Sequence, residues 1–169
     1  MKGKGAVKRL LIVFHSMTGG TRQMAEAAAR AAAAEDGIAV ALRPAAAAGP
    51  DDLLAADGFI FACPEALASM TGVMKDFFDR SYYAGLDRLQ GRPYAVLICA
   101  GGDGTNAARQ IARIATGWRL RAVAEPVIVC TRAQTPAAIL APKVIAEEDL
   151  QRSAELGAAL AAGLALGVF

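Results

Sequence analysis

The chain has 169 residues, of which 55% are hydrophobic and 20% charged, a globular composition at a size expected for one domain. Its 18 basic and 16 acidic residues give a formal net charge of +2, and this mild, scattered charge argues against nucleic acid as a partner. We therefore expect a single domain over residues 1–169, with residues 1–6 as a flexible tail.

Apolar runs in the sequence are short. The run at residues 10–14, after the basic start, is shorter than a signal-peptide core of about 7–15 residues, and the uncharged tail at 156–169 is shorter than the roughly 18 apolar residues of a membrane span. We therefore expect a cytoplasmic protein without a membrane span.

Strand-like and helix-like stretches alternate along the chain. Short apolar runs predict strands, and longer runs with apolar residues at helical spacing predict helices. The predicted strands are residues 7–14, 38–42, 58–63, 93–100 and 120–130, the last with Pro126 inside it. The predicted helices are residues 21–35, 51–56, 72–83, 105–116 and 147–166. This alternation predicts an α/β fold in which a five-stranded parallel sheet carries helices on both faces.

Ligands of such sheets bind outside the carboxyl ends of the strands, where the strand order reverses. Four loops reach this edge of the predicted sheet: residues 15–20, 64–71, 100–106 and 131–136. The site is therefore expected among these loops.

The first loop joins a strand to a helix through two glycines and several hydroxyls. Free N–H groups in the first turn of a helix and the helix dipole attract anions, and Gly19 and Gly20 let the backbone approach closely. We therefore expect a phosphate loop, whose members are Ser16, Met17, Thr18, Gly19, Gly20 and Thr21. The alternative is an ordinary helix cap at Thr21 after a flexible turn.

Three segments in order carry a family resemblance: SMTGGT after the first strand, DGFIFACPEALASMTGVMKDFFDR over residues 57–80, and GRPYAVLICAGGDG over residues 91–104. Together they resemble the flavodoxin-like FMN proteins, most of all the NAD(P)H-dependent FMN or quinone reductases. The resemblance covers most of residues 7–130 and implies a three-layer flavodoxin-like fold.

The resemblance implies an FMN cofactor shared among three loops. The hydroxyl-rich first loop would hold the FMN phosphate. The second loop would lie against one edge or face of the isoalloxazine, through Pro64, Glu65, Ala66, Leu67, Ala68, Ser69 and Met70. The glycine loop would lie against the other and donate backbone N–H groups to the N1/O2 edge of the ring, through Ala100, Gly101, Gly102, Asp103 and Gly104.

The second loop departs from many relatives because PEALAS contains neither an aromatic residue nor a glycine. Leu67 could pack on the ring through apolar burial alone. Glu65 would have to point away from a reduced, negatively charged ring.

The implied activity is ping-pong transfer of electrons from NAD(P)H through FMN to a small acceptor such as a quinone, azo or nitro compound, with no side-chain acid or base required. A flavodoxin-type electron carrier is one alternative, although carriers of that kind are typically acidic and this chain is not. A flavodoxin-shaped module with weak or no FMN binding is another. A homo-oligomer stays open, because Tyr82 and Tyr83 could meet a second subunit.

Further motifs indicate less favoured sites. GGDGT at residues 101–105 is also found in diacylglycerol and NAD kinases, but those resemble two-domain proteins with a β-rich second half, and this chain ends in a helix. A zinc site of His15, Cys63, Cys99 and Cys130 would spread its ligands over strands about 4.8 Å apart, too far for tetrahedral zinc. Cys99 also resembles a nucleophile elbow, with His15 as its only available base. Trp118 is expected in packing at the opposite edge.

Overall fold

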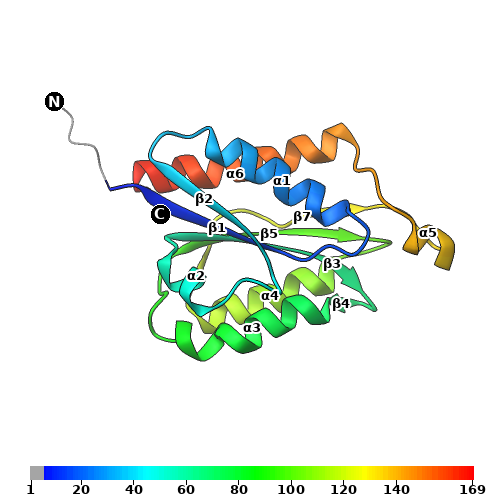
Figure 1. The fold of residues 1–169 in the computed structure, drawn as a ribbon, viewed down its shortest axis with the longest axis horizontal. Helices are drawn as coiled ribbons and strands as arrows, with labels where there is room; N and C mark the ends of the chain where they lie inside the picture. The colour runs from blue at the N-terminus through cyan, green and yellow to red at the C-terminus, as the bar shows by residue number, and fades with distance from the viewer. Residues whose placement is uncertain (1–5) are drawn as a thin grey trace.

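A parallel sheet runs through the molecule between two layers of helices (Figure 1). The computed structural model describes residues 6–169, so the predicted tail, residues 1–6, lies outside the described residues except for Ala6. The strands of the sheet are β1 (Lys8–Phe14), β2 (Ile38–Pro44), β3 (Gly58–Ala66), β5 (Pro93–Ala100), β6 (Arg121–Ala122) and β7 (Val127–Cys130). Their order is β2-β1-β3-β5-β6, with β7 also paired to β5 and all of these pairs parallel.

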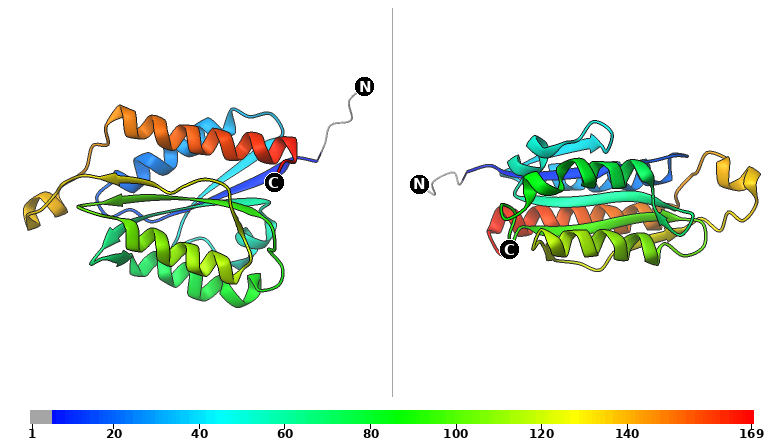
Figure 2. Two further views of the ribbon diagram at one scale, coloured as in Figure 1. Left: turned by 180° about the vertical axis from the view of Figure 1, so that it is seen from behind. Right: turned by 90° about the horizontal axis from the view of Figure 1, so that it is seen from below.

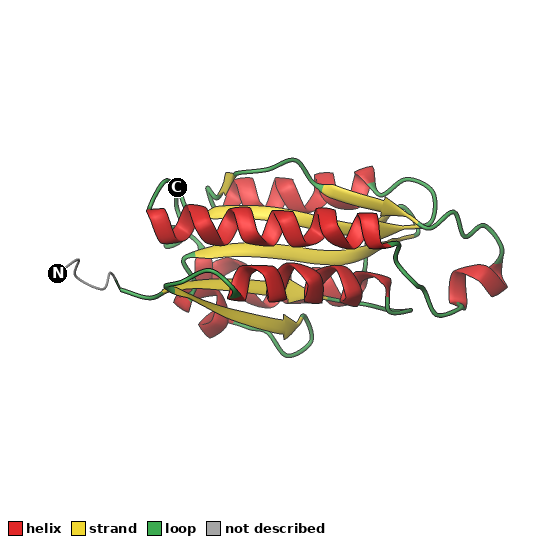
Figure 3. Ribbon diagram, turned by 90° about the horizontal axis from the view of Figure 1, so that it is seen from above, coloured by secondary structure: helices red, strands yellow, loops and turns green. Residues whose placement is uncertain are grey.

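Helices cover both faces of this sheet, as predicted. One face carries α1 (Gly20–Ala33) and α6 (Glu147–Leu166), which lie side by side and run roughly along the strands (Figure 3). The other face carries α2 (Pro50–Ala55), α3 (Gly72–Gly85) and α4 (Thr105–Gly117). The three-layer α/β architecture expected from the sequence is therefore confirmed. None of the helices in residues 6–169 is long and apolar enough to cross a membrane.

Two hydrophobic cores fill the spaces between the sheet and its helices. Side chains of a strand alternate between the faces, so Phe59 and Phe61 pack toward α3 and α4, while Ile60 and Ala62 pack toward α1 and α6. All eight residues of β5 are buried. This two-sided burial explains why the central strands are continuous apolar runs in the sequence.

The edge strand expected at residues 120–130 is broken in two. Tyr94 of β5 pairs with Ala122, and Leu97 pairs with Val127, so four residues of the edge strand stand opposite two residues of β5. Pro126 lies in this bulge, where its missing N–H group removes no hydrogen bond from the ladder. The prediction of one continuous strand was wrong for this reason.

The structure also contains two elements that were not predicted. Strand β3 continues past the predicted end at residue 63 and turns back through β4 (Ser69–Met70), with which it pairs antiparallel. The short helix α5 (Pro136–Leu140) stands away from the body at the carboxyl end of the sheet (Figure 2).

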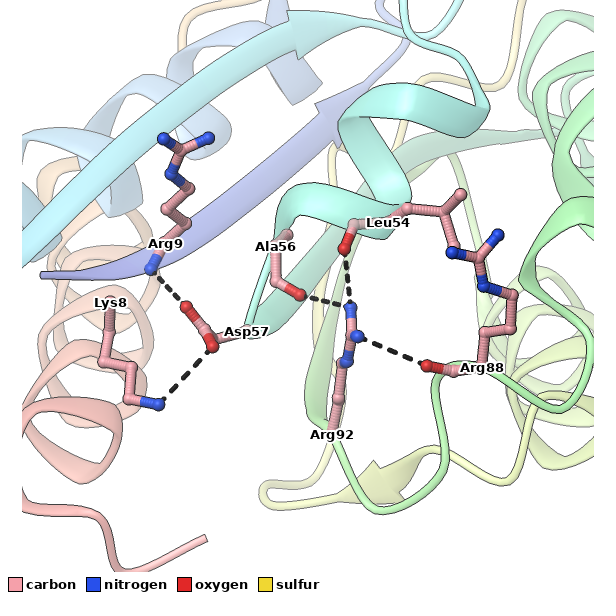
Figure 4. A network of polar contacts seen from close by, with 7 residues as sticks. All are labelled: Lys8, Arg9, Leu54, Ala56, Asp57, Arg88 and Arg92. Atoms are coloured by element: carbon pink, nitrogen blue, oxygen red, sulfur yellow. Dashed lines mark hydrogen bonds and ion pairs between the residues drawn. The ribbon is translucent and has the colours of Figure 1, made fainter. Parts of the chain in front are cut away.

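The amino-terminal edge of the sheet is held together by charged side chains (Figure 4). The Asp57 carboxylate accepts hydrogen bonds from the Arg9 amide at 2.8 Å and from Lys8 Nζ at 3.5 Å. The Arg92 guanidinium donates to the carbonyls of Leu54 and Ala56 at the end of α2. Trp118 lies at this same edge of the sheet. It is fully buried and its Nε1 donates to a backbone carbonyl of α3, which confirms that it is a packing residue.

Candidate cofactor site

A cavity of about 430 Å³ lies at the carboxyl ends of β1, β3 and β5. The chain proceeds from β1 outward to β2 and then returns to β3 on the other side of β1, so the strand order reverses here. This reversal point is where flavodoxin-like sheets bind their ligands. All three loops that were predicted to hold FMN contribute to the cavity.

The structure brings most of the predicted site residues together. Those lining the cavity are Ser16, Met17, Thr18, Gly20, Thr21, Pro64, Glu65, Ala66, Leu67, Ala100 and Gly101. The predicted residues that do not line it are Gly19, Ala68, Ser69, Met70, Gly102, Asp103 and Gly104. Ser69 and Met70 instead line a separate cavity of about 420 Å³ beside α3 and α4.

The first loop is folded around the Ser16 hydroxyl. Ser16 Oγ accepts hydrogen bonds from the amides of Gly19 at 3.2 Å and Arg22 at 3.3 Å, and Gly19 has a left-handed backbone with φ of +93°. Gly19 is also the N-cap of α1, so the alternative of a side-chain cap at Thr21 does not apply. The loop is therefore a defined structure rather than a flexible turn.

Several donors in this loop have no partner. The amides of Met17, Thr18, Gly20 and Thr21 find no hydrogen-bond acceptor within residues 6–169. The Thr21 hydroxyl is buried and likewise has no partner among the described residues. Gly20 and Thr21 are buried, and buried polar groups are rarely left unpaired in folded proteins. The donors of these two residues, at the N-terminus of α1, therefore fit an anionic group such as the FMN phosphate.

Gly20 is required by a close approach between the loop and the sheet. A Cβ atom at this position would lie 2.7 Å from Cys99 Sγ and 3.3 Å from Ile145 Cδ1. The helix α1 can begin so close to β5 only because residue 20 has no side chain.

The Gln23 side chain fastens the first loop to the segment after α5. Its Nε2 donates to the carbonyls of Gly19 at 2.9 Å and Lys143 at 2.8 Å, and its Oε1 accepts from the Ile145 amide at 3.0 Å. The Lys143 amide in turn donates to the Thr18 carbonyl at 2.9 Å. The pocket wall is thus built from segments more than 100 residues apart in the sequence.

The wall is completed by residues outside the predicted FMN set. These are Cys99, Ile139, Leu140 and Lys143, together with Thr131 and Ala133 of the fourth loop that the sequence placed at this edge. Most of them belong to the segment around α5. The sequence signal for α5 is the dipeptide Thr135-Pro136, since threonine is a common N-cap and proline suits the first helical position. In the structure the Thr135 hydroxyl caps the helix by accepting from the Ala138 amide at 3.2 Å. Nothing in the local sequence indicates that α5 stands beside the cavity.

The second loop is a tight hairpin between β3 and β4. Its two central residues, Leu67 and Ala68, both have left-handed backbones, with φ of +52° and +58°. Two-residue hairpin turns of this kind normally use asparagine and glycine, and each left-handed L-residue costs about 1–2 kcal/mol. The side chain of Leu67 is fully exposed at the rim of the cavity.

Glu65 turns its carboxylate toward the first turn of α4. Oε1 accepts from the Gly104 amide at 2.9 Å, and Oε2 accepts from the Ala107 amide at 3.0 Å. The negative charge therefore lies at the positive end of the α4 dipole. This contact could not be predicted from the sequence, because it joins residues about forty positions apart.

The third loop offers free amides on its first half only. The amides of Gly101, Gly102 and Asp103 find no acceptor within the described residues, whereas the Gly104 amide is taken by Glu65. The Asp103 carboxylate bonds to Thr105, and these hydrogen bonds lower its pKa. A kinase-like use of GGDGT would require phosphate where the Glu65 carboxylate already lies.

His15 links the first loop to the start of α3. Its Nδ1 lies 2.8 Å from the Thr71 hydroxyl, and burial lowers the pKa of the imidazole. Cys63 belongs to the core on the α3 and α4 face, whereas Cys99 belongs to the core on the α1 and α6 face. Burial raises the pKa of Cys63 to about 12 and that of Cys99 to about 11, which disfavours the thiolate form that a nucleophile needs at neutral pH.

Comparison with known proteins decides the family. The profile of the family described as NADPH-dependent FMN reductase matches residues 40–134, which are 95 of the 169 residues. The chain belongs to this family. Membership in the NADPH-dependent FMN reductase family confirms the resemblance drawn from the sequence, and it supports FMN as the cofactor and an NAD(P)H-dependent oxidoreductase as the class of protein. The matched residues contain the second and third loops of the cavity, and the first loop lies before them.

One curated relative has a related description. The chain is 36% identical over 95 residues to an "NAD(P)H dehydrogenase (quinone)" from Acidithiobacillus ferrooxidans, an alignment that covers 44% of this chain and 48% of the relative. The chain thus matches about half the length of that relative.

Solved structures share the fold of this NADPH-dependent FMN reductase family member at low sequence identity. A flavodoxin from the domain Archaea superimposes with a TM-score of 0.74 at 19% identity, covering 92% of this chain and 98% of that one. A flavodoxin, WrbA-like protein from Agrobacterium tumefaciens superimposes with a TM-score of 0.72 at 18% identity, covering 95% and 98%.

Proposed function

We propose that this chain binds FMN at the carboxyl edge of its sheet and passes electrons from NAD(P)H through FMN to a quinone or a similar small acceptor. The observation that carries the proposal is the set of unpaired donors in the loop between β1 and α1. Family membership and the similarity to an NAD(P)H dehydrogenase (quinone) support the same activity. The cytoplasmic location and a homo-oligomer stay predictions.

The first loop would hold the FMN phosphate. The amides of Gly20 and Thr21 and the buried Thr21 hydroxyl can all donate to phosphate oxygens, and the α1 dipole adds partial positive charge. Lys143 lines the cavity, but its ammonium group donates to the carbonyls of Ala138 and Ile139 at the end of α5. Phosphate recognition would therefore rest on backbone and hydroxyl donors.

The second and third loops would enclose the isoalloxazine. FMN, when bound, supplies the chemistry of two-electron transfer. Gly101 lines the cavity, and its free amide can donate to an electron-rich edge of the ring, which favours its reduced form. Aliphatic side chains rather than aromatic ones form the walls, because none of the residues lining the cavity is aromatic.

The mouth of the cavity favours an apolar acceptor. Met17 and Leu140 keep 62% and 69% of their surfaces exposed at this mouth, and Leu67 is fully exposed. A flat, uncharged molecule that stacks above the ring would cover these side chains and gain from their burial. A quinone has this chemistry.

The test compares FMN with riboflavin, which lacks the phosphate. Flavin fluorescence is titrated with the apoprotein and with Thr21→Val, which removes the unpaired hydroxyl at nearly constant volume. A hydrogen bond to a charged group contributes about 1.5–3 kcal/mol, so we expect FMN affinity to fall roughly 10- to 100-fold in the variant while riboflavin affinity is unchanged. The apo variant should be at least as stable as the wild type, since a buried unpaired hydroxyl is removed.

Turnover then separates the alternatives. Steady NAD(P)H consumption with a soluble quinone supports the reductase, whereas FMN binding without such turnover supports an electron carrier. Protein that takes up neither flavin refutes FMN binding and leaves a flavodoxin-shaped module.

A further inference from the structure

The hairpin beside the cavity holds an unfavourable backbone shape without glycine. Leu67 and Ala68 are both left-handed, and neither is among the residue types that adopt this conformation readily. Such strain persists only where the surroundings fix it, and it is frequent at ligand sites. The contacts that hold this hairpin therefore bear on the site.

Within residues 6–169, the side-chain hydrogen bonds to the hairpin tip and to β4 come from α4. Asn106 Nδ2 donates to the Ala68 carbonyl at 2.6 Å. Gln110 Oε1 accepts from the Met70 amide at 2.8 Å and from the Ser69 hydroxyl at 3.0 Å. These two side chains lie one turn apart on α4 and clamp the returning strand of the hairpin.

Glu65 makes the matching contact from the outgoing strand. It is half-buried, lines the cavity, and directs both carboxylate oxygens at the amides of Gly104 and Ala107. Gly104 ends the glycine loop, so the same carboxylate fixes the hairpin and the loop whose first glycine, Gly101, lines the cavity. The two walls of the ring site are thereby joined through one side chain.

We propose that Glu65 is a positioning residue that joins the hairpin and the glycine loop into one preformed wall for the flavin ring, and that keeps anions away from the start of α4. This inference rests on the proposed FMN binding. It answers why a carboxylate stands beside a site for an electron-rich ring: its charge is neutralised by two amides and a helix dipole. At the start of α1, by contrast, the amides of Gly20 and Thr21 have no acceptor within residues 6–169 and stay available for a phosphate.

The experiment measures the dissociation constants of FMN and riboflavin for the wild type and for Glu65→Gln. The glutamine can keep one amide contact, but its NH₂ group opposes the other. We expect affinity for both flavins to fall by a similar factor, on the order of tenfold, because the ring wall is loosened and the phosphate loop is intact. The FMN-to-riboflavin affinity ratio therefore stays constant, in contrast to Thr21→Val.

Two further variants make the test independent of the folding of Glu65→Gln. Asn106→Ala removes the hydrogen bond to the Ala68 carbonyl together with an exposed one from Arg109, but it leaves the Glu65 contacts in place, so we expect the same pattern with a smaller loss. Glu65→Ala leaves the amides of α4 open, and we expect added formate to restore riboflavin affinity to this variant alone. The exposed Glu125 does not line the cavity, and Glu125→Gln serves as the matched control with no change for either flavin.

The outcomes separate this inference from the proposed function. Wild-type binding with unchanged affinities in Glu65→Gln overturns the positioning role while FMN binding stands. A loss confined to FMN also overturns it, because Glu65 would then act at the phosphate end. A wild type that binds neither flavin overturns both. A proportional loss for both flavins, with rescue of Glu65→Ala by formate, supports the role as stated.

Discussion

Substitution of Gly20 by alanine tests the close approach between the phosphate loop and the sheet. The added methyl group would meet Cys99 Sγ at 2.7 Å, a distance that real Cβ atoms do not tolerate, and Ile145 Cδ1 at 3.3 Å. Cys99 is buried on β5 and borders the cavity. The clash must be relieved by turning the Cys99 side chain out of its present packing, by moving the start of α1 or by distorting β5.

The size of the effect follows from overpacking. Forcing a methyl group into a packed core costs about 1–3 kcal/mol. The higher helix propensity of alanine relative to glycine offsets less than about 1 kcal/mol of this cost. Cys99→Ala alone removes a buried sulfur and leaves a small cavity, at a cost of about 1–2 kcal/mol. In the double variant the methyl group added at position 20 occupies the volume that the sulfur has left. We therefore expect the two changes to offset each other by about 1–2 kcal/mol.

The assay is urea unfolding of the four apoproteins of this double-mutant cycle, followed by circular dichroism. Gly72→Ala is the matched control, since Gly72 also begins a helix and a Cβ there would meet nothing within 4 Å. It should change the free energy of unfolding by less than about 1 kcal/mol. If the Gly20 and Cys99 changes add to within about 0.5 kcal/mol, the steric explanation of Gly20 is refuted.

Three further predictions concern stability. Ala68→Gly should stabilise the apoprotein by up to about 1 kcal/mol in urea unfolding, because relief of the left-handed strain exceeds the added backbone entropy; destabilisation would contradict the strain. The pKa of Cys63 is raised from 9.0 to about 12, so above pH 9 the thiol ionises in the unfolded state first, and the free energy of unfolding should fall as pH rises past 9. Cys63→Ala should lessen this fall, and an unchanged pH slope in the variant would contradict the prediction. Burial lowers the pKa of His15 below 6.5, so the unfolded state takes up a proton first, and stability should be lost as pH falls below 6.5. In thermal unfolding between pH 5 and 8, His15→Gln should reduce this loss of stability at the acidic end.

The sequence predicted the sheet well because its signal is local. Strands such as β1 and β5 are buried on both faces, so their residues form continuous apolar runs that stand out from amphipathic helices like α4. The loops at the carboxyl edge follow from the parallel order alone. The family resemblance then located the first three loops of the cavity, and their lining residues are largely the predicted ones.

The missed parts depend on contacts between distant residues. The hairpin at Leu67 and Ala68 has no glycine or asparagine to mark it, because side chains of α4 hold its shape. Gln23 resembles any polar helix residue until the fold brings Lys143 to it. The role of Glu65 likewise appears only when β3 and α4 are placed side by side. Such interactions have no signature in a local window of sequence.

The interruption between β6 and β7 has a consequence for how copies of this protein can meet. An unbroken outer strand would present a regular row of free amides and carbonyls, which invites another chain to add itself to the sheet and start an aggregate. Here that row is broken by the bulge around Pro126 after two paired residues. Self-association along this border is therefore disfavoured, and any symmetric pairing of copies would have to use helix surfaces or the opposite border at β2.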